Sequence, residues 1–327
     1  MPTVSVIIPT YRHEAFMIEC LDSVFAQTFK DFEVIVVNDG SPDQTETILQ
    51  PLIASGQIQY AYQETCGPAA ARNCGLALAK GEFVAFLDDD DLWPPDKLQW
   101  QLDSIEDGGP VAVVGVRQIF KDRIEQIDQT AIKPATLQRT LRFEDFFERN
   151  PIGSPGQVLI RRSTLTALGG FDETVWGADD LDLWLRLSRL GEIRFSPKLA
   201  LFYRVHAGNA SKDRLTMMRN VERVLQKHLT SDDNLEHRIL SKKANRYLFR
   251  SAGKDIIRQM VAQYRNGKVT EANQLSSAFY RHFSEKIFND PKLLISVCTT
   301  FVDALARSVS PSMLFKNGII RPSKYLF

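Results

Sequence analysis

Short apolar runs alternate with segments of helical spacing through the first 120 residues of the chain. The runs at residues 4–8, 32–38, 58–63 and 83–87 are typical of buried strands. The segments between them, at residues 14–27, 45–54 and 68–79, have the apolar spacing of helices. This order restricts the chain to the α/β class, because parallel strands need crossover connections that are usually helical. We therefore expect a Rossmann-like, mostly parallel central sheet with helices on both faces.

Polar residues follow three of these predicted strands. Pro9, Thr10 and Tyr11 come after the first strand and Asp39 after the second. Four consecutive aspartates, Asp88 to Asp91, come after the fourth. In sheets of this kind, ligands bind beyond the carboxyl ends of the strands. We therefore expect these three segments to line one site.

The four consecutive aspartates are the sharpest chemical feature of the sequence. Adjacent carboxylates repel one another unless water or a cation neutralises them. At the end of a buried strand they can hold Mg²⁺ or Mn²⁺, and the cation can in turn hold a diphosphate. The alternative is a solvated acidic turn before the helix that is expected near Pro94 and Pro95.

Two further segments carry candidate functional residues. Arg72 lies in a predicted helix of small residues, and it could pair with a phosphate or a base carbonyl or simply lie on the surface of that helix. Asp179, Asp180 and Asp182 stand at the start of a helix predicted over residues 180–190. The helix dipole alone would explain these acids, but one of them could also accept a proton from a substrate hydroxyl. Trp176, just before them, offers a flat aromatic face for a sugar.

His206 follows a predicted strand that ends in Tyr203-Arg204-Val205. A single histidine is more often structural than a ligand, although neutral imidazole is the commonest metal-binding side chain. Both interpretations stay open on the sequence alone.

The formal net charge of zero hides an asymmetry between two regions. Residues 1–211 carry 19 Lys and Arg against 30 Asp and Glu, a net charge of −11, whereas residues 212–327 carry 21 against 10, a net charge of +11. We predict an α/β domain over residues 1–211 and a basic, mostly helical region over residues 212–327. The basic region favours an anionic partner, which could be an acceptor, a membrane surface, the acidic half or a second subunit in a homo-oligomer.

The N-terminus begins with a predicted strand and lacks the basic flank and cleavage site of a signal peptide. No stretch approaches the roughly 20 apolar residues of a membrane-spanning helix. The four cysteines show no close pairing and no metal-ligand spacing, and their mostly apolar or helical surroundings predict buried, reduced thiols. We expect a cytoplasmic protein, with peripheral contact at the inner face of the membrane as an open alternative.

Seven short motifs follow one another between residues 2 and 211. They are Val6-Ile7-Ile8-Pro9-Thr10-Tyr11, Val37-Asn38-Asp39-Gly40-Ser41, Ala70-Ala71-Arg72-Asn73-x-Gly75, Phe86-Leu87-Asp88-x-Asp90-Asp91-x-Trp93 after Gly81-Glu82-Phe83, Gly169-Gly170-Phe171-Asp172-Glu173, Ala178-Asp179-Asp180-x-Asp182-Leu183-Trp184-x-Arg186, and Tyr203-Arg204-x-His206. Each motif alone is common. As an ordered set, they resemble those of the family-2 inverting glycosyltransferases of the GT-A fold.

The resemblance implies a role for each side chain of the donor and metal site. Tyr11 and Asp39 would hold the nucleotide base, and Asp39 would accept a hydrogen bond from a ring N–H as in uridine, so a UDP-sugar is the favoured donor. Asp90 would bind Mn²⁺ or Mg²⁺ directly, and Asp88 would contact the ribose or a metal-bound water. His206 would approach the metal and the diphosphate.

The resemblance also implies a general base and an acceptor site. Asp180 would deprotonate the acceptor hydroxyl as it attacks the face of the sugar opposite the diphosphate. Asp179 and Asp182 are alternatives for this role, because the family commonly has Glu at position 179. Trp176 would contact the acceptor. The remaining residues of the donor site are Pro9, Thr10, Arg72 and Asp89.

The expected activity is therefore that of a hexosyltransferase, as in polysaccharide biosynthesis. Its partners would be a nucleotide-sugar donor and a glycan or lipid-linked acceptor, with no nucleic acid. A catalytically inactive sugar- or nucleotide-binding protein of the same fold is the first alternative. A sugar-phosphate nucleotidyltransferase is less favoured, because it would carry a Gly- and Lys/Arg-rich loop after the first strand. A dehydrogenase is disfavoured by the missing G-x-G-x-x-G fingerprint.

Overall fold

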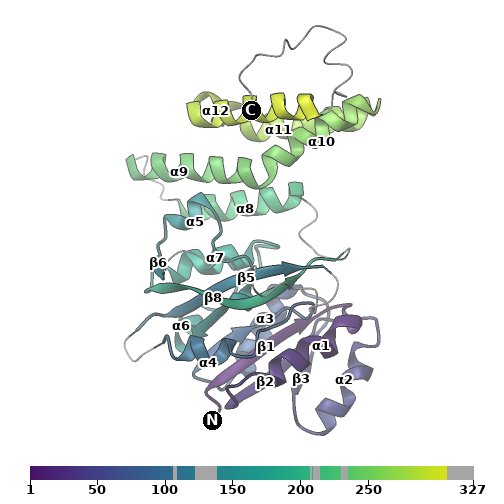
Figure 1. The fold of residues 1–327 in the computed structure, drawn as a ribbon, viewed down its shortest axis with the longest axis vertical. Coiled ribbons are helices and arrows are strands. Elements are labelled where there is room, and N and C mark those ends of the chain that lie inside the picture. The colour runs from purple at the N-terminus through teal and green to yellow at the C-terminus, as the bar shows by residue number, and fades with distance from the viewer. Residues whose placement is uncertain (106–108, 122–137, 207, 209–213, 230–234, 308–327) are drawn as a thin grey trace, which may run out of the picture. The chain divides into compact units, whose positions relative to one another are not determined.

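The computed structural model describes residues 1–105, 109–121, 138–206, 208, 214–229 and 235–307 (Figure 1). The chain divides into two compact units. Unit 1 comprises Met1–Asp213 with Arg223–His228, and unit 2 comprises Arg214–Glu222 with Leu229–Phe327. The domain boundary predicted near residue 212 falls within residues 209–213, outside the described part of the chain.

Unit 1 is built on one eight-stranded mixed sheet with the strand order β3-β2-β1-β4-β7-β5-β8-β6 (Figure 1). Four of the neighbouring pairs are parallel: β1 with β2, β1 with β4, β2 with β3, and β5 with β8. β7 is antiparallel to both of its neighbours, β4 and β5, and β6 is antiparallel to β8. The strands are β1 (Val4–Thr10), β2 (Phe32–Asn38), β3 (Gln59–Tyr62), β4 (Phe83–Phe86), β5 (Ala112–Phe120), β6 (Arg139–Leu141), β7 (Val158–Arg161) and β8 (Ile193–Arg204).

The helices of unit 1 cover both faces of the sheet, as the alternation of the sequence predicts. Val6 and Ile8 of β1 pack in one core cluster with Met17 of α1. Ile7 points to the opposite face, where a Cβ placed on Gly75 of α3 would lie 2.3 Å from its Cγ2, so α3 approaches β1 closely at a glycine. The helices are α1 (Glu14–Phe25), α2 (Thr45–Ala54), α3 (Pro68–Leu78), α4 (Lys97–Leu102), α5 (Asp145–Glu148), the 3₁₀ turn η3 (Pro155–Gln157), α6 (Arg162–Ala167) and α7 (Asp179–Leu187).

The predicted strands and helices of the first 120 residues are all present, with ends that differ by a few residues. The clearest difference is at β1, which continues through Pro9 and Thr10 because both pair in register with β2. The expectation of buried thiols is wrong for Cys66 and Cys298, which are exposed, whereas Cys20 is buried.

The carboxyl ends of β1, β2 and β4 lie side by side, because the three strands are parallel neighbours. Thr10 pairs with Asn38, and the amide of Asp39 donates to the carbonyl of Thr10 at 2.9 Å. On the other side, the amide of Leu87 donates to the carbonyl of Ile7 at 3.0 Å. This pairing brings the loops after the three strands to one edge of the sheet.

Unit 2 is helical over its described residues. It holds the first part of α8 (Arg214–His228), then α9 (Leu235–Leu248), the π-helical turn η5 (Phe249–Gly253), α10 (Lys254–Arg265), α11 (Val269–Phe288) and α12 (Pro291–Arg307). Its core contains a cluster of aromatic rings, Phe249, Phe279 and Phe283. Within the described ranges, no helix is long and apolar enough to cross a bilayer.

Candidate active site

Arg72 joins two of the predicted acidic segments. Its guanidinium is buried in α3, where Nη2 donates to Asp88 Oδ1 at 2.7 Å and Nη1 donates to Asp179 Oδ2 at 2.9 Å. Desolvation lowers the pKa of Arg72, but the charges of Asp88 and Asp179 outweigh it and raise the pKa above its usual value. The acidic run and the start of α7 therefore belong to one site, with a permanent cation between them.

Asp89 and Asp90 each contact a histidine. Asp89 Oδ1 lies 2.6 Å from His13 Nδ1, and Asp90 Oδ2 lies 2.8 Å from His206 Nε2. His13, Asp90 and His206 each offer one ligand atom, and these three atoms all lie within 4.8 Å of one another. Two imidazoles and one carboxylate suit Mn²⁺ better than Mg²⁺, which prefers oxygen ligands. The residues present therefore fit a divalent transition-metal cation.

His13 is oriented as metal-binding histidines usually are. Its Nδ1 is directed at Asp89, and carboxylates commonly fix a ligating imidazole in this way. Its Nε2 and the ring of His206 both lie close to Gly208. A Cβ built on Gly208 would be 4.0 Å from His13 Nε2 and 3.1 Å from His206 Cε1, so this nitrogen lies on the side of His206. The hydrogen bond that His13 Nδ1 donates to Asp89 raises the pKa of His13, so a cation would compete with a proton for this ring. Sequence reasoning missed His13, although it stands three residues beyond β1, where ligands are expected.

Asp91 is fully buried and anchors the acidic loop. Its Oδ1 accepts from the amide of Arg204 in β8 at 2.8 Å, and Arg204 Nε donates to the carbonyl of Asp90 at 2.8 Å. Arg204 also pairs with Glu19 of α1 at 2.6 Å. Burial raises the pKa of Asp91 well above its usual value. Arg204 thus fixes the backbone that carries the metal-site residues.

Asp180 lies in the first turn of α7. Its Oδ1 accepts from the amide of Leu181 at 2.6 Å, and Asn150 Nδ2 donates to Oδ2 at 3.4 Å. Desolvation and then the charge of Asp179 raise the pKa of Asp180 to about 7. Desolvation also raises the pKa of Asp179, against the attraction of Arg72. A carboxyl group that titrates near neutral pH can take up a proton from a hydroxyl, as a general base must.

Three basic side chains contact the carboxylate of Asp182. Asp182 is fully buried, and it accepts from Arg186 Nε at 2.7 Å and Lys227 Nζ at 2.8 Å and lies 2.8 Å from His228 Nε2. Burial opposes its charge, but the hydrogen bonds from His228 and Lys227 and the charge of Arg186 hold the pKa of Asp182 well below its usual range. This cluster ties the last residues of α8, which belong to unit 1, to α7.

Asp39 binds the loop that leads into α3. Its Oδ1 accepts from Gln63 Nε2 at 2.7 Å and from the amide of Cys66 at 2.8 Å, and its Oδ2 accepts from the amide of Gly67 at 2.9 Å. A carboxylate has about four acceptor sites, so these contacts leave room for a further donor. Asp39 therefore holds its own loop in place at the sheet edge.

The end of β1 presents one exposed ring. Pro9 and Thr10 are buried within the strand, whereas Tyr11 is 37% exposed. The amide of Tyr11 donates to Asp89 Oδ2 at 3.2 Å, which links the β1 loop to the acidic run. Arg12 has a φ of 63°, a conformation that is strained for a residue with a Cβ and is typical of functional sites.

Trp176 lies beside the start of α3. Its indole is 53% exposed, and a Cβ on Gly67 would lie 3.9 Å from Trp176 Cδ1. Gly67 in turn donates its amide to Asp39. The predicted acceptor residue is thus next to the loop that Asp39 holds, in the same site as the other predicted residues.

The sequence model of glycosyl transferase family 2 matches residues 5–169. An uncharacterized glycosyltransferase of Rickettsia prowazekii is 31% identical over 223 residues, which are 68% of this chain and 70% of the relative. The uncharacterized glycosyltransferase EpsJ of Bacillus subtilis is 40% identical over 92 residues, 28% of this chain and 27% of that protein.

Solved structures share the fold. S. aureus TarS 1–349 in complex with UDP-GlcNAc has a TM-score of 0.63 at 19% identity, covering 92% of this chain and 89% of that one. The mannosyltransferase PcManGT of Pyrobaculum calidifontis, in complex with GDP-Man and Mn²⁺, has a TM-score of 0.58 at 22% identity, covering 94% and 86%. A longer S. aureus TarS chain has a TM-score of 0.57 at 25% identity. The match covers 75% of this chain and 43% of that one.

Proposed function

This chain belongs to glycosyl transferase family 2, and from that membership we propose that it transfers a sugar from a nucleotide-diphosphate sugar to a hydroxyl group with inversion at the anomeric carbon. The observation that carries the proposal is the position of Arg72. Its guanidinium bonds Asp88, which is two residues from the metal-site residue Asp90, and Asp179, which is next to the candidate base Asp180. The metal site and the candidate base therefore lie close together.

His13, Asp90 and His206 would hold a divalent cation, for which we favour Mn²⁺ over Mg²⁺ because two of the three ligands are imidazoles. Bound there, the cation would neutralise the diphosphate and make it a better leaving group. Arg72 would pair with phosphate oxygens, for which its planar fork is suited. Asp89 would orient His13 rather than contact the donor.

For the general base we propose Asp180 rather than its two neighbours. Its pKa of about 7 matches the operating pH of a base in neutral solution. Asp179 is committed to Arg72, and Asp182 is fully buried among three basic partners that disfavour its protonation. Asp180 would accept the proton of the acceptor hydroxyl as that oxygen attacks the sugar. Water must stay out of the site during this step, because it would hydrolyse the donor.

For the nucleotide we propose uridine, with the base held between Tyr11 and Asp39. The remaining acceptor capacity of Asp39 is suited to a ring N–H. The similar structures bind UDP-GlcNAc in one case and GDP-Man in another, so a GDP-linked donor is the second candidate. Trp176 would contact a sugar of a glycan or lipid-linked acceptor through its exposed ring.

The test is calorimetric titration of the full chain with UDP, GDP and dTDP, each with Mn²⁺ and with EDTA. We expect binding of UDP that requires Mn²⁺ and that weakens at least tenfold in Asp90→Ala. Asp103→Ala, which removes an exposed aspartate at the end of α4, is the matched control and should bind as the parent does. If no nucleotide binds under either condition, the catalytic proposal is refuted and a fold that has lost its donor site takes its place.

A further inference from the structure

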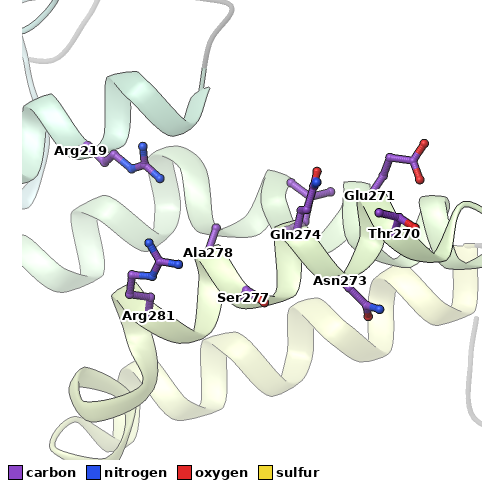
Figure 2. Close-up of a pocket in the computed structure, with 9 residues that line it drawn as sticks. Arg219, Thr270, Glu271, Asn273, Gln274, Ser277, Ala278 and Arg281 are labelled. Atoms are coloured by element: carbon purple, nitrogen blue, oxygen red, sulfur yellow. The ribbon is translucent and has the colours of Figure 1, made fainter.

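Unit 2 carries a groove of about 730 Å³ between α8 and α11 (Figure 2). Grooves of this volume are typical of small-ligand sites. One wall is Arg219, in the part of α8 that belongs to unit 2, and the other is a face of α11. None of the residues predicted to act on the donor or the acceptor lines it.

The face that α11 turns to the groove is mostly polar, with Leu275 and Ala278 as its apolar members. It presents Thr270, Asn273, Gln274, Ser277 and Arg281, whose spacing of three, four, seven and eleven residues places them on one side of a helix. These five side chains are exposed. Amides and hydroxyls bind the hydroxyls of sugars, whereas an apolar ligand or the interior of a bilayer would leave them without partners.

One end of the groove is strongly basic. Figure 2 shows the guanidinium groups of Arg219 and Arg281 at this end and Glu271 at the other. Among the described side chains, neither Arg219 nor Arg281 forms an ion pair. Two uncompensated guanidinium groups that face one space attract a phosphate or a carboxylate, which Arg can bind through two parallel hydrogen bonds.

The nearby acid does not neutralise this end. Glu222 of α8 already accepts from Lys286 and lies 3.8 Å from His282 Nε2. Burial and the positive charges of Lys286, Arg219 and Arg281 together lower the pKa of His282, with only Glu222 opposing them. The field at this end of the groove is therefore positive.

We propose that the groove binds an anionic oligosaccharide, with a phosphate or carboxylate group between Arg219 and Arg281 and sugar hydroxyls along Gln274 and Ser277. The identification of this ligand as the acceptor glycan rests on the proposed function. The binding of an anionic oligosaccharide to the groove does not depend on that function. A concave groove lined mostly by polar residues favours a glycan over a membrane surface, since membrane contact would use mainly apolar side chains around the basic residues.

The experiment titrates the full chain with trigalacturonate, with neutral maltotriose and with inorganic phosphate, monitored by calorimetry. We expect trigalacturonate to bind and maltotriose to bind at least tenfold more weakly. Arg219→Gln with Arg281→Gln should weaken trigalacturonate at least tenfold. Ser277→Phe, which fills the groove without a change of charge, should do the same. Inorganic phosphate should bind more weakly than trigalacturonate, because it lacks the sugar contacts.

Arg258→Gln is the control for the loss of a positive charge elsewhere in unit 2. It removes one positive charge from α10 outside the groove, where Arg258 pairs with Asp255, and it should leave the affinity for trigalacturonate unchanged. UDP binding with Mn²⁺ should be unaltered in all of these variants, so a failure here is distinguishable from a failure of the proposed function. Equal weakening by Arg258→Gln, equal affinity for maltotriose, or no binding of trigalacturonate would each overturn the proposal. Binding to phosphatidylglycerol vesicles without binding to trigalacturonate would overturn it in favour of a lipid surface.

Discussion

The ionisation of Asp180 should set the pH dependence of transfer. Its pKa of about 7 means that roughly one tenth of the protein carries the ionised base at pH 6 and roughly nine tenths at pH 8. Because the base must be ionised to accept a proton, kcat/KM should rise about tenfold between these two pH values. Asp180→Asn should lower kcat by a factor on the order of 10² to 10⁴, since it removes the base without a large change of shape.

A neighbouring substitution tests the cause of the raised pKa. Desolvation is the largest cause of the raised pKa of Asp180, and the charge of Asp179 is the second. Asp179→Asn removes this repulsion and leaves Arg72 less neutralised, and both effects favour ionised Asp180. The rising limb of the profile should therefore move to lower pH, by about one unit for a neighbouring carboxylate.

The assay is release of the nucleotide diphosphate from the donor that binds, with Mn²⁺ and the acceptor present. It runs from about pH 5.5 to about pH 9, a range that covers the rising limb expected from Asp180. Asp103→Asn controls for the loss of an acidic group elsewhere in unit 1. If Asp180→Asn keeps more than a tenth of the parent activity, Asp180 is not the base. If Asp179→Asn has the rising limb of the parent, the raised pKa does not come from the charge of Asp179.

Three further substitutions have expected outcomes. Asp89→Asn should weaken Mn²⁺ binding about ten- to hundredfold in calorimetry, because it removes the group that orients His13; an unchanged affinity would remove His13 from the ligand set. Asp182→Asn should lower the free energy of unfolding by about 3 kcal/mol, because Arg186, Lys227 and His228 lose their buried counter-charge. Tm should fall by about 6–12 °C. A loss of stability under about 1 kcal/mol would mean that this cluster contributes little to folding. Gly75→Ala should destabilise unit 1 by about 1–3 kcal/mol in denaturant unfolding, because the added Cβ would meet Ile7, and a neutral result would mean that α3 can shift.

Much of the fold follows from local patterns in the sequence. The apolar runs and helical spacing of the first 120 residues predict the first four strands and three helices, because each of these elements buries a face that its own residues define. The position of β7 could not be predicted in this way. Its apolar residues suit any buried strand, and only pairing with residues more than 40 positions away makes it antiparallel between β4 and β5.

The site was predictable only in part, for the same reason. The parallel sheet brings the loops after β1, β2 and β4 together, so the expectation that these segments share one edge follows from chain order. Chain order does not predict which residue each of the four aspartates contacts. A shift of the run by one residue along the backbone would change the direction in which every one of its side chains points. The cluster around Asp182 also escaped prediction, since Lys227 and His228 lie about 45 residues away in a region expected to be separate.

β7 lies in the sheet between β4 and β5, yet it is synthesised after both of them. On the ribosome, β1 to β4 can pair as they emerge, whereas β4 and β5 each keep an unpaired edge until residues 158–161 are available. Unpaired edges are templates for association with other chains. A nascent chain that ends just before β7 should therefore aggregate, and one that extends past β8 should fold, so translation pauses between these two points are where this protein is most exposed to misassembly.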